Sequence, residues 1–267
     1  MLALKVKMLF RMNILLTNDD GIYAEGLWAL DEALRREHAV TVVAPDRERT
    51  AVSHGITLHQ PLRASRVALN GRCEGYAVNG TPADCIKLGV LEILGRRPDL
   101  VVSGLNPGAN VGVNINYSGT VAAAKEAALG GIPAVAASIE TGAPYACETA
   151  AGFIAQLVRA VARRGLAPGT FLNVNFPNAP WQDIAGVRAS RHGLSLFKEY
   201  MEKRIDPRQR TYYWQGADMQ TFDDDPDIDG AALRHRFISI TPIKCDMTDY
   251  DALRDLRRWD FEWRGKG

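Results

Sequence analysis

The chain has 267 residues, of which 46% are hydrophobic and 24% are charged, and its formal net charge is +1. This composition is typical of a globular protein with a sizeable core, and the near-neutral charge argues against nucleic acid polymers or an anionic membrane as partners. No apolar run approaches the roughly 18 residues of a membrane-spanning helix.

The cysteines and histidines argue against a zinc site. The four cysteines include no CxxC pair, and the five histidines include no HxxxH motif. Unpaired thiols are typical of the reducing cytoplasm, where we expect this protein to be located. Residues 1–11 are too short and too interrupted by lysine for a secretory signal, so we interpret them as an extension before a single domain at 12–267.

Hydrophobic patterning in the first two-thirds of the chain predicts alternating strands and helices. Short apolar runs predict strands at 14–17, 40–44, 100–103, 134–138 and 171–175. Longer segments with helical periodicity predict helices at 24–37, 82–94, 118–129 and 148–164, and a β-rich stretch is expected at 55–78. This order is typical of an α/β protein with a Rossmann-like, doubly wound, mostly parallel sheet.

The final third has a different pattern, with few long apolar runs. It predicts strands at 187–190, 211–214 and 237–241 and a helix at 250–258, joined by polar connections. We therefore expect a core over 12–185 and a β-rich C-terminal extension over 186–267. The extension would pack on a neighbour, which is either the same subunit or a partner. The aromatic run 212–214 is expected in the core or at a subunit interface.

Two adjacent acids, Asp19 and Asp20, follow the first predicted strand and precede Gly21. Ligands of open α/β sheets bind at the carboxyl ends of strands, and paired carboxylates favour a divalent metal. Neighbouring strand side chains point to opposite faces, so both acids face one ion only if the chain turns at Gly21. An ordinary Asx turn is the structural alternative.

Three further loops carry small polar residues. Thr50 lies after the second predicted strand, Asn106 lies after the third, and Ser118-Gly119-Thr120 begins a predicted helix. Carboxylate, hydroxyl and amide oxygens from Asp19, Asp20, Thr50 and Asn106 would suit Mg²⁺ or Mn²⁺. The helix start is either a phosphate site or a plain N-cap.

The segment 79–84 predicts a helix start. Thr81 is a candidate N-cap, Pro82 the first helical residue and Asp84 the partner in a capping box. The alternative is that Asn79 and Thr81 face a substrate.

Five ordered segments together resemble the SurE (survival protein E) family of metal-dependent 5′-nucleotidases. They are NILLTNDDGIYAEGL, VVAPDRERTAVSHGITL, VNGTPADCIKLGV, PDLVVSGLNPGANVG and YSGTVAAAKEA. The resemblance implies a Rossmann-like core, a C-terminal extension used in a homodimer or homotetramer, and hydrolysis of nucleoside 5′-monophosphates. Family members often also act on 3′-nucleotides, and some act on short polyphosphate.

The resemblance also implies site residues. The metal, one Mg²⁺ or Mn²⁺ per subunit, would bind Asp19, Asp20, Thr50 and Asn106, where Thr50 replaces the usual serine of the family. Asp19 or Asp20 would orient the attacking water or accept its proton. The expected phosphate or substrate residues are Asn79, Ser103, Gly104, Asn110, Ser118, Gly119 and Thr120. A nucleotide sensor without turnover and a general phosphomonoesterase remain as alternative functions.

Overall fold

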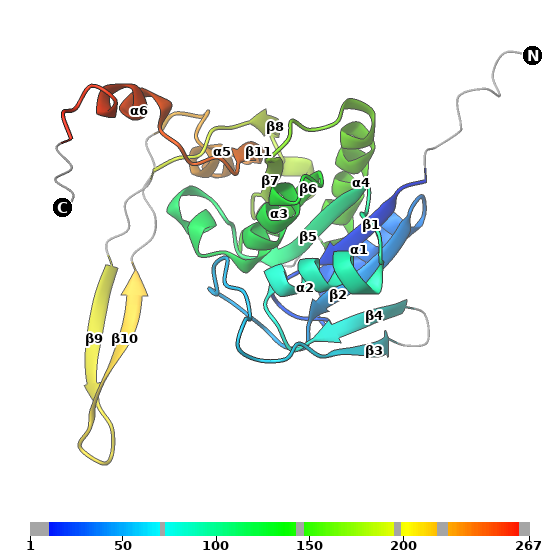
Figure 1. Ribbon diagram of the computed structural model, residues 1–267, viewed down its shortest axis with the longest axis horizontal. Helices are drawn as coiled ribbons and strands as arrows, with labels where there is room; N and C mark the ends of the chain where they lie inside the picture. The colour runs from blue at the N-terminus through cyan, green and yellow to red at the C-terminus, as the bar shows by residue number, and fades with distance from the viewer. Residues whose placement is uncertain (1–10, 70–72, 143–146, 195–198, 218–223, 262–267) are drawn as a thin grey trace, which may run out of the picture.

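The computed structural model describes residues 11–69, 73–142, 147–194, 199–217 and 224–261. Residues 1–10 of the expected N-terminal extension therefore lie outside the described residues. Within the described ranges, nine strands form one sheet in the order β3-β4-β2-β1-β5-β6-β7-β11-β8. The prediction of a doubly wound, mostly parallel α/β sheet is confirmed (Figure 1).

The six central strands of this sheet are parallel. They are β4 (Cys73–Val78), β2 (Ala39–Pro45), β1 (Asn13–Thr17), β5 (Leu100–Pro107), β6 (Ala134–Ile139) and β7 (Thr170–Phe176). At the edges, β3 (Ala64–Leu69) is antiparallel to β4, β11 (Phe237–Lys244) is antiparallel to β7, and β8 (Gly186–Ala189) is parallel to β11.

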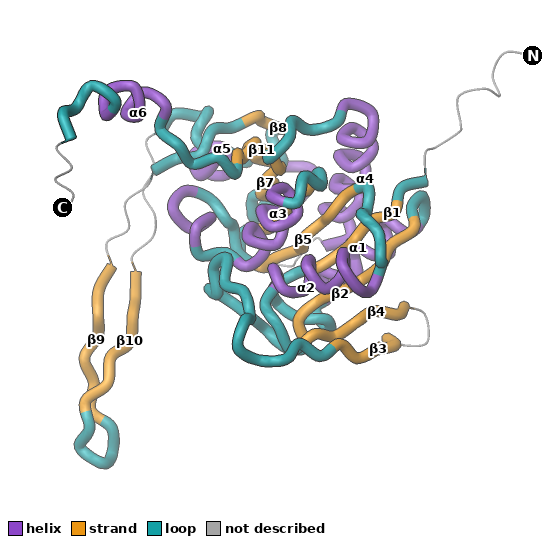
Figure 2. The backbone as a smooth tube through the Cα atoms, in the orientation of Figure 1, coloured by secondary structure: helices purple, strands orange, loops and turns teal. Residues whose placement is uncertain are grey.

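Both faces of the sheet are covered because its central strands are apolar on both sides. In β1, Leu16 belongs to the core on one face and Leu15 to the core on the other. Helices α1 (Glu25–Arg35) and α4 (Cys147–Arg164) cover the first face. Helices α2 (Pro82–Leu88) and α3 (Gly119–Leu129) cover the second (Figure 2).

The strand order places a topological switch point between β1 and β5. From β1 the chain moves to β2 and β4 on one side, and it then returns to β5 on the other side of β1. Connections on opposite sides of the sheet leave a crevice at the carboxyl ends of the two middle strands. Asp19, Asp20 and Asn106 lie at those ends.

Three predicted elements differ from the structure. The helix predicted at 82–94 ends as α2 at Leu88 and continues as a π-helix, Gly89–Ile93. The predicted third strand runs on to Pro107, because Asn106 and Pro107 pair with β6. The β-rich stretch begins only at Ala64, because the polar groups before it bond to helices and not to strands.

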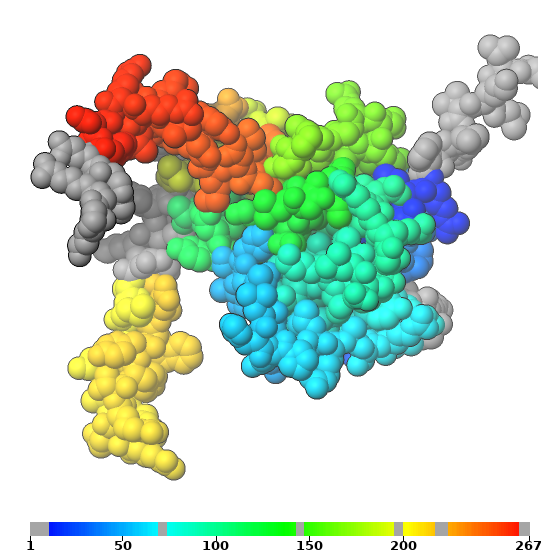
Figure 3. Space-filling model, in the orientation of Figure 1, coloured from blue at the N-terminus to red at the C-terminus, as the bar shows by residue number. Residues whose placement is uncertain are grey.

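The C-terminal third divides into two parts. Strands β8 and β11 join the main sheet, and a helix that the sequence did not reveal, α5 (Asp229–Arg234), packs beside β11. Strand β10 (Thr211–Ala217) pairs with an unpredicted strand, β9 (Glu199–Ile205), in a hairpin that projects from the body (Figures 1 and 3). Helix α6 (Tyr250–Leu256) follows near the end of the chain. The part of the extension after residue 186 that forms β8 and β11 thus packs on the same subunit.

No helix among the described residues is both long and apolar enough to cross a bilayer.

Candidate functional site

The turn after β1 is built around Asn18. Its side-chain oxygen accepts a hydrogen bond from Gly21 N at 3.2 Å, and its side-chain nitrogen donates to Gly21 O at 3.0 Å. Gly21 has φ of 103°, a conformation that disfavours residues with a Cβ. The predicted Asx-type turn is therefore present, and it is this turn that takes Asp19 and Asp20 out of strand geometry.

Both acids line a cleft of about 370 Å³ at the switch point. The lining residues are Asp19, Asp20, Glu48, Thr50, Ala51, Asn106, Pro107, Asn110, Asn114, Tyr117 and Ser118. The structure thus brings together all four residues expected to bind metal, from the ends of β1, β2 and β5. Since the sequence places them up to 87 positions apart (from 19 to 106), only the sheet order could bring them together.

Asp19 is fixed at the start of α3. It is 5% exposed, and its Oδ1 accepts a hydrogen bond from the Thr120 hydroxyl. Burial raises the pKa of Asp19, although hydrogen bonds from Thr120 and the backbone N–H groups of Gly119 and Thr120 act in the opposite direction. The first turn of α3 therefore holds one carboxylate of the cleft.

Asp20 is half-buried, and one of its two carboxylate oxygens is unpaired among the described residues. Burial, the charge of Asp19 and the charge of Glu48 together raise the pKa of Asp20 to about 7. Its buried Oδ2 has no hydrogen-bond partner among the described residues. A divalent cation would supply both missing interactions, because it neutralises the acids and coordinates the free oxygen. The residues present therefore fit a metal ion.

The other two expected ligands add neutral oxygens. The Thr50 hydroxyl donates to Glu48 Oε1, which leaves the lone pairs of the hydroxyl oxygen open. The Asn106 side-chain nitrogen donates to Gly108 O at 2.7 Å, so the amide oxygen is the group left for a cation. Among the described residues no three His, Cys, Asp or Glu side chains lie close enough together to hold a metal.

Glu48 was missed from the sequence. It lines the cleft, bonds to Thr50 and raises the pKa of Asp20. The sequence did offer a clue, because Glu48 lies two residues before Thr50 in the loop that was expected to bind the metal. Charged residues in loops are usually only solvated, however, so Glu48 was not selected.

The loop that carries Thr50 is tied to the rest of the site by its backbone. Arg49 N donates to Asp19 O at 2.7 Å, and Ser53 N donates to Tyr117 O at 3.0 Å. Both bonds connect the loop to other walls of the same cleft. Thr50 therefore lies in a segment whose position depends on the two neighbouring loops.

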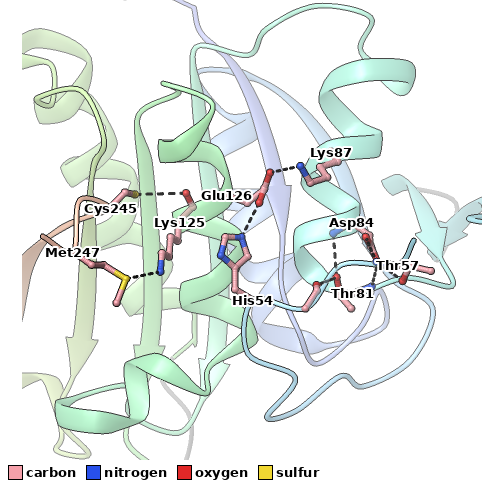
Figure 4. A network of polar contacts seen from close by, with 10 residues as sticks. His54, Thr57, Thr81, Asp84, Lys87, Lys125, Glu126, Cys245 and Met247 are labelled. Atoms are coloured by element: carbon pink, nitrogen blue, oxygen red, sulfur yellow. Dashed lines mark hydrogen bonds and ion pairs between the residues drawn. The ribbon is translucent and has the colours of Figure 1, made fainter. Parts of the chain in front are cut away.

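Side chains further along this loop attach it to α2 and α3 (Figure 4). His54 Nε2 and Glu126 Oε2 are 2.7 Å apart, and Lys87 Nζ lies 2.7 Å from Glu126 Oε1. Thr57 bonds to Asp84 through its backbone N–H at 2.9 Å and its hydroxyl at 2.6 Å. These contacts explain why the stretch is an ordered loop where β-structure was expected.

Two of the expected phosphate residues line the cleft, Asn110 and Ser118. Asn110 N donates to Asn175 Oδ1 at 2.7 Å, and its side-chain nitrogen donates to Ser138 Oγ at 2.8 Å. Ser118 is the N-cap of α3, where its hydroxyl accepts a hydrogen bond from Val121 N at 3.1 Å. Both side chains are held by protein contacts before any ligand binds.

The other five expected phosphate residues are not among those that line the cleft, and their contact with phosphate stays a prediction. Ser103 is 0% exposed inside the sheet, and a Cβ at Gly104 would lie 2.4 Å from Ala137 O, so that glycine permits close strand packing. Asn79 bonds to Arg63 N at 2.7 Å and fastens the loop before β3. Gly119 and Thr120 are buried against Asp19.

The segment 79–84 has the structural role proposed for it. Thr81 is the N-cap of α2, and its hydroxyl accepts from Asp84 N at 3.1 Å while Asp84 Oδ2 accepts from Thr81 N at 2.9 Å. The predicted capping box, with Pro82 in the first turn, is confirmed.

A mostly parallel sheet with an oxygen-lined cleft at its switch point defines an α/β protein whose ligand site lies at the carboxyl ends of its strands. The model of the family Survival protein SurE matches residues 14–199, which is more than half of the chain. The chain therefore belongs to the SurE family, as its motifs indicated.

Individual proteins that are similar to this chain also belong to the SurE family by name. A protein named 5′-nucleotidase SurE from Desulfatibacillum aliphaticivorans is 56% identical over 253 residues, covering 94% of this chain and 99% of the relative. Its namesake from Syntrophobacter fumaroxidans is 50% identical and covers 93% and 100%. The crystal structure of the SurE protein from Aquifex aeolicus superposes with a TM-score of 0.80 at 36% identity, covering 92% of this chain and 98% of that one.

Proposed function

We propose that this protein is a divalent-metal-dependent phosphomonoesterase that hydrolyses nucleoside 5′-monophosphates to nucleoside and phosphate. The observation that carries the proposal is the cleft itself, where Asp19 and Asp20 meet Thr50 and Asn106 and where Asp20 Oδ2 has no partner among the described residues. The relatives named 5′-nucleotidase SurE, at 56% and 50% identity, support the substrate class. Activity on 3′-nucleotides or short polyphosphate is a secondary expectation.

The metal, Mg²⁺ or Mn²⁺, would be held by Asp19, Asp20, Thr50 and Asn106. Hard oxygen donors favour these ions over zinc. When bound, the cation supplies charge stabilisation for the phosphoryl group and makes a water molecule more acidic. Glu48 then acts on the metal site indirectly, because it accepts a hydrogen bond from the Thr50 hydroxyl and orients that oxygen.

The phosphate would lie against Asn110 and Ser118. The start of α3 is at this wall, and the positive end of an 11-residue helix favours a phosphate oxygen. Thr120 and Gly119 contribute by fixing Asp19. Asn110 is fixed by Ser138 and Asn175, so it binds without a large loss of side-chain entropy.

Asp20 is the better candidate for orienting the water and accepting its proton. The Thr120 hydroxyl bonds to Asp19 Oδ1, whereas Asp20 Oδ2 has no hydrogen-bond partner among the described residues and is open to a water molecule. A covalent route through serine has little support, because Ser53 Oγ donates to Asn116 O and the adjacent His54 bonds to Glu126.

We further propose a cytoplasmic homodimer or homotetramer in which the hairpin β9–β10 meets a second copy of the chain. Tyr213 and Trp214 are each 59% exposed on this hairpin. An isolated two-stranded hairpin is marginally stable in water, and exposed aromatics are typical of interfaces. Neither a nucleic acid polymer nor a membrane is proposed as a partner.

The test is phosphate release from AMP, GMP and their 3′ isomers, first with EDTA and then with added Mg²⁺ or Mn²⁺. Metal should restore release, with the 5′ isomers preferred. Asp20→Asn should lower kcat/KM by at least about 100-fold and should abolish the increase in melting temperature that metal gives the unmodified protein. Glu32→Gln, which removes an exposed carboxylate on α1, serves as the control and should change neither quantity.

Two results would contradict the proposal. Tight nucleotide binding without release under any metal would make the protein a nucleotide sensor. Equal kcat/KM for p-nitrophenyl phosphate and AMP would make it a general phosphomonoesterase.

A further inference from the structure

Gly112 is held on both sides by residues of the C-terminal third. Its backbone N–H donates to Asp229 Oδ2 at 3.0 Å, and its carbonyl accepts a hydrogen bond from His192 Nε2 at 2.8 Å. Gly112 begins the 3₁₀ helix Gly112–Asn116 with φ of 55°, a conformation that favours glycine. Two contacts from residues 117 and 80 positions away in the sequence thus fix the first residue of the 3₁₀ helix that leads to the cleft wall.

Asp229 is fully buried and bonds only to backbone N–H groups in these contacts. Its Oδ2 accepts from Gly112, while its Oδ1 accepts from Gly193 N at 3.2 Å and from Gly230 N at 2.9 Å. A carboxylate can accept all three bonds at once, but a side-chain amide cannot, because its nitrogen only donates. The position therefore depends on the carboxylate and not merely on a polar side chain of this size.

The two segments that hold Gly112 also hold each other. Arg191 N donates to Asp227 O at 2.7 Å, and Asp229 N donates to Arg191 O at 3.0 Å. The hairpin β9–β10 lies between these two segments in the sequence. Residues 191–193, before the hairpin, and residues 227–230, after it, are thus bonded to each other. We call these two segments the clamp.

The 3₁₀ helix Gly112–Asn116, which the clamp holds at Gly112, leads directly into one wall of the cleft. Asn114 belongs to it, Tyr117 is its C-cap, and Ser118 follows; all three line the cleft. Ser53 N also bonds to Tyr117 O, so the wall in turn supports the loop that carries Thr50. A 3₁₀ turn of five residues has weak internal hydrogen bonds, and external contacts therefore decide its position.

We propose that Asp229 is a positioning residue, which acts through Gly112 to set the wall formed by Asn114, Tyr117 and Ser118 against the metal-binding edge of the cleft. The C-terminal third then contributes to catalysis within its own subunit. The kinetic part of this inference rests on the proposed phosphatase function, whereas the structural part does not.

The kinetic test compares Asp229→Asn with Asp227→Asn in the full chain. Asp229→Asn should lower kcat/KM for AMP by about 10- to 100-fold, mostly through KM, because the wall formed by Asn114, Tyr117 and Ser118 moves while Asp19 and Asp20 stay in the turn after β1. Metal affinity should change less than the KM for AMP. Asp227 joins the clamp only through its backbone carbonyl, so Asp227→Asn changes an exposed side chain near Arg188 and should leave KM and kcat unchanged.

Hydrogen exchange provides a readout that does not need activity. In Asp229→Asn the amide hydrogens of 112–117 should exchange about 10- to 100-fold faster, while those of β1 and β5 keep their protection. If Asp229→Asn does not fold, His192→Ala tests the same clamp through the carbonyl of Gly112, with a smaller increase in exchange and in KM.

The outcomes separate the two proposals. Unchanged exchange at 112–117 in a folded variant would overturn the clamp, as would a loss of kcat with KM and local exchange unaltered. If the unmodified protein releases no phosphate but exchange still rises at 112–117, the clamp stands and the phosphatase proposal fails.

Discussion

The cleft and the β9–β10 hairpin differ in the kind of group that each leaves unpaired among the described residues: buried acids in the cleft and exposed aromatic side chains on the hairpin. In the cleft, Asp19 and Asp20 bring negative charge into a partly buried place, and one buried oxygen has no partner within the described residues. On the hairpin, Tyr200, Tyr213 and Trp214 are 53%, 59% and 59% exposed. Elsewhere in the sheet, the apolar groups of the described strands are buried on both faces.

The kind of group left without a partner indicates the chemistry of the partner that would bind there. Buried acids without a counter-charge require a cation, because an uncompensated buried charge is costly. Exposed aromatics require apolar surface, since their burial is worth about 25 cal/mol per Å². The first partner would be a metal ion, and the second would be another copy of the chain.

Among substitutions outside the expected metal ligands, the largest effect is expected from Gly119→Ala. The added Cβ would lie 2.8 Å from Asp19 Cβ and 3.0 Å from Asp19 Oδ2, so the carboxylate must move. A shift of this size at a metal-binding site should lower metal affinity by about 10- to 100-fold, with a parallel loss of kcat/KM. Calorimetric titration with Mn²⁺ measures the affinity directly.

Gly152→Ala in α4 is the matched control. A Cβ at this helical glycine meets nothing within 4 Å, so the substitution should stabilise the protein by about 0.5–1 kcal/mol and leave Mn²⁺ binding unchanged. Equal metal affinity in both variants would show that the contact between Gly119 and Asp19 does not control the site.

A smaller effect, on assembly and not on the cleft, is expected from Trp214→Glu. Removing a central interface aromatic and adding charge should weaken subunit association by about 30-fold, while the melting curve of the body stays the same. Gln215→Glu adds the same charge on the opposite face of β10 and is the control. Sedimentation velocity over a range of concentrations distinguishes the two, and equal association of both variants would exclude this face as the interface.

The smallest effect is expected at Thr50. Thr50→Ser keeps the hydroxyl that bonds to Glu48 and removes only the branching methyl group, so metal affinity should change by less than about 10-fold. Thr50→Val keeps the shape but removes the oxygen, and it should weaken Mn²⁺ binding more than Thr50→Ser does. If Val and Ser variants bind Mn²⁺ equally, the hydroxyl is not a ligand.

Local sequence patterns predicted most of the fold. The apolar run before Asp19 and the leucines of α1 have the periods of a buried strand and an amphipathic helix, and the structure has both. The capping box at Thr81 was also readable, because its contacts span three residues. By contrast, β9 was missed because charged residues interrupt its sequence, EYMEKRI, so that it has no apolar run, and α5 was missed because it is only six residues long.

The candidate site was predictable only in part. Asp19, Asp20, Thr50 and Asn106 were chosen because each follows an apolar run, and the parallel order of β2, β1 and β5 brings them together. Ser103 was chosen by the same reasoning but is buried, because β5 continues four residues beyond it to Pro107. Whether a polar residue at a strand end faces the cleft depends on the length of pairing with the next strand.

By itself, the sequence determined which segments are apolar on one face or two, where helices begin, and which loops carry oxygen ligands. The tertiary structure alone decided that Glu48 raises the pKa of Asp20, that Gly119 packs on Asp19, and that Asp229 holds Gly112. The physical reason is the distance along the sequence between the residues that interact. Strand and helix periods arise from neighbouring residues, whereas burial and charge at a site arise from segments that meet only after the whole sheet has formed.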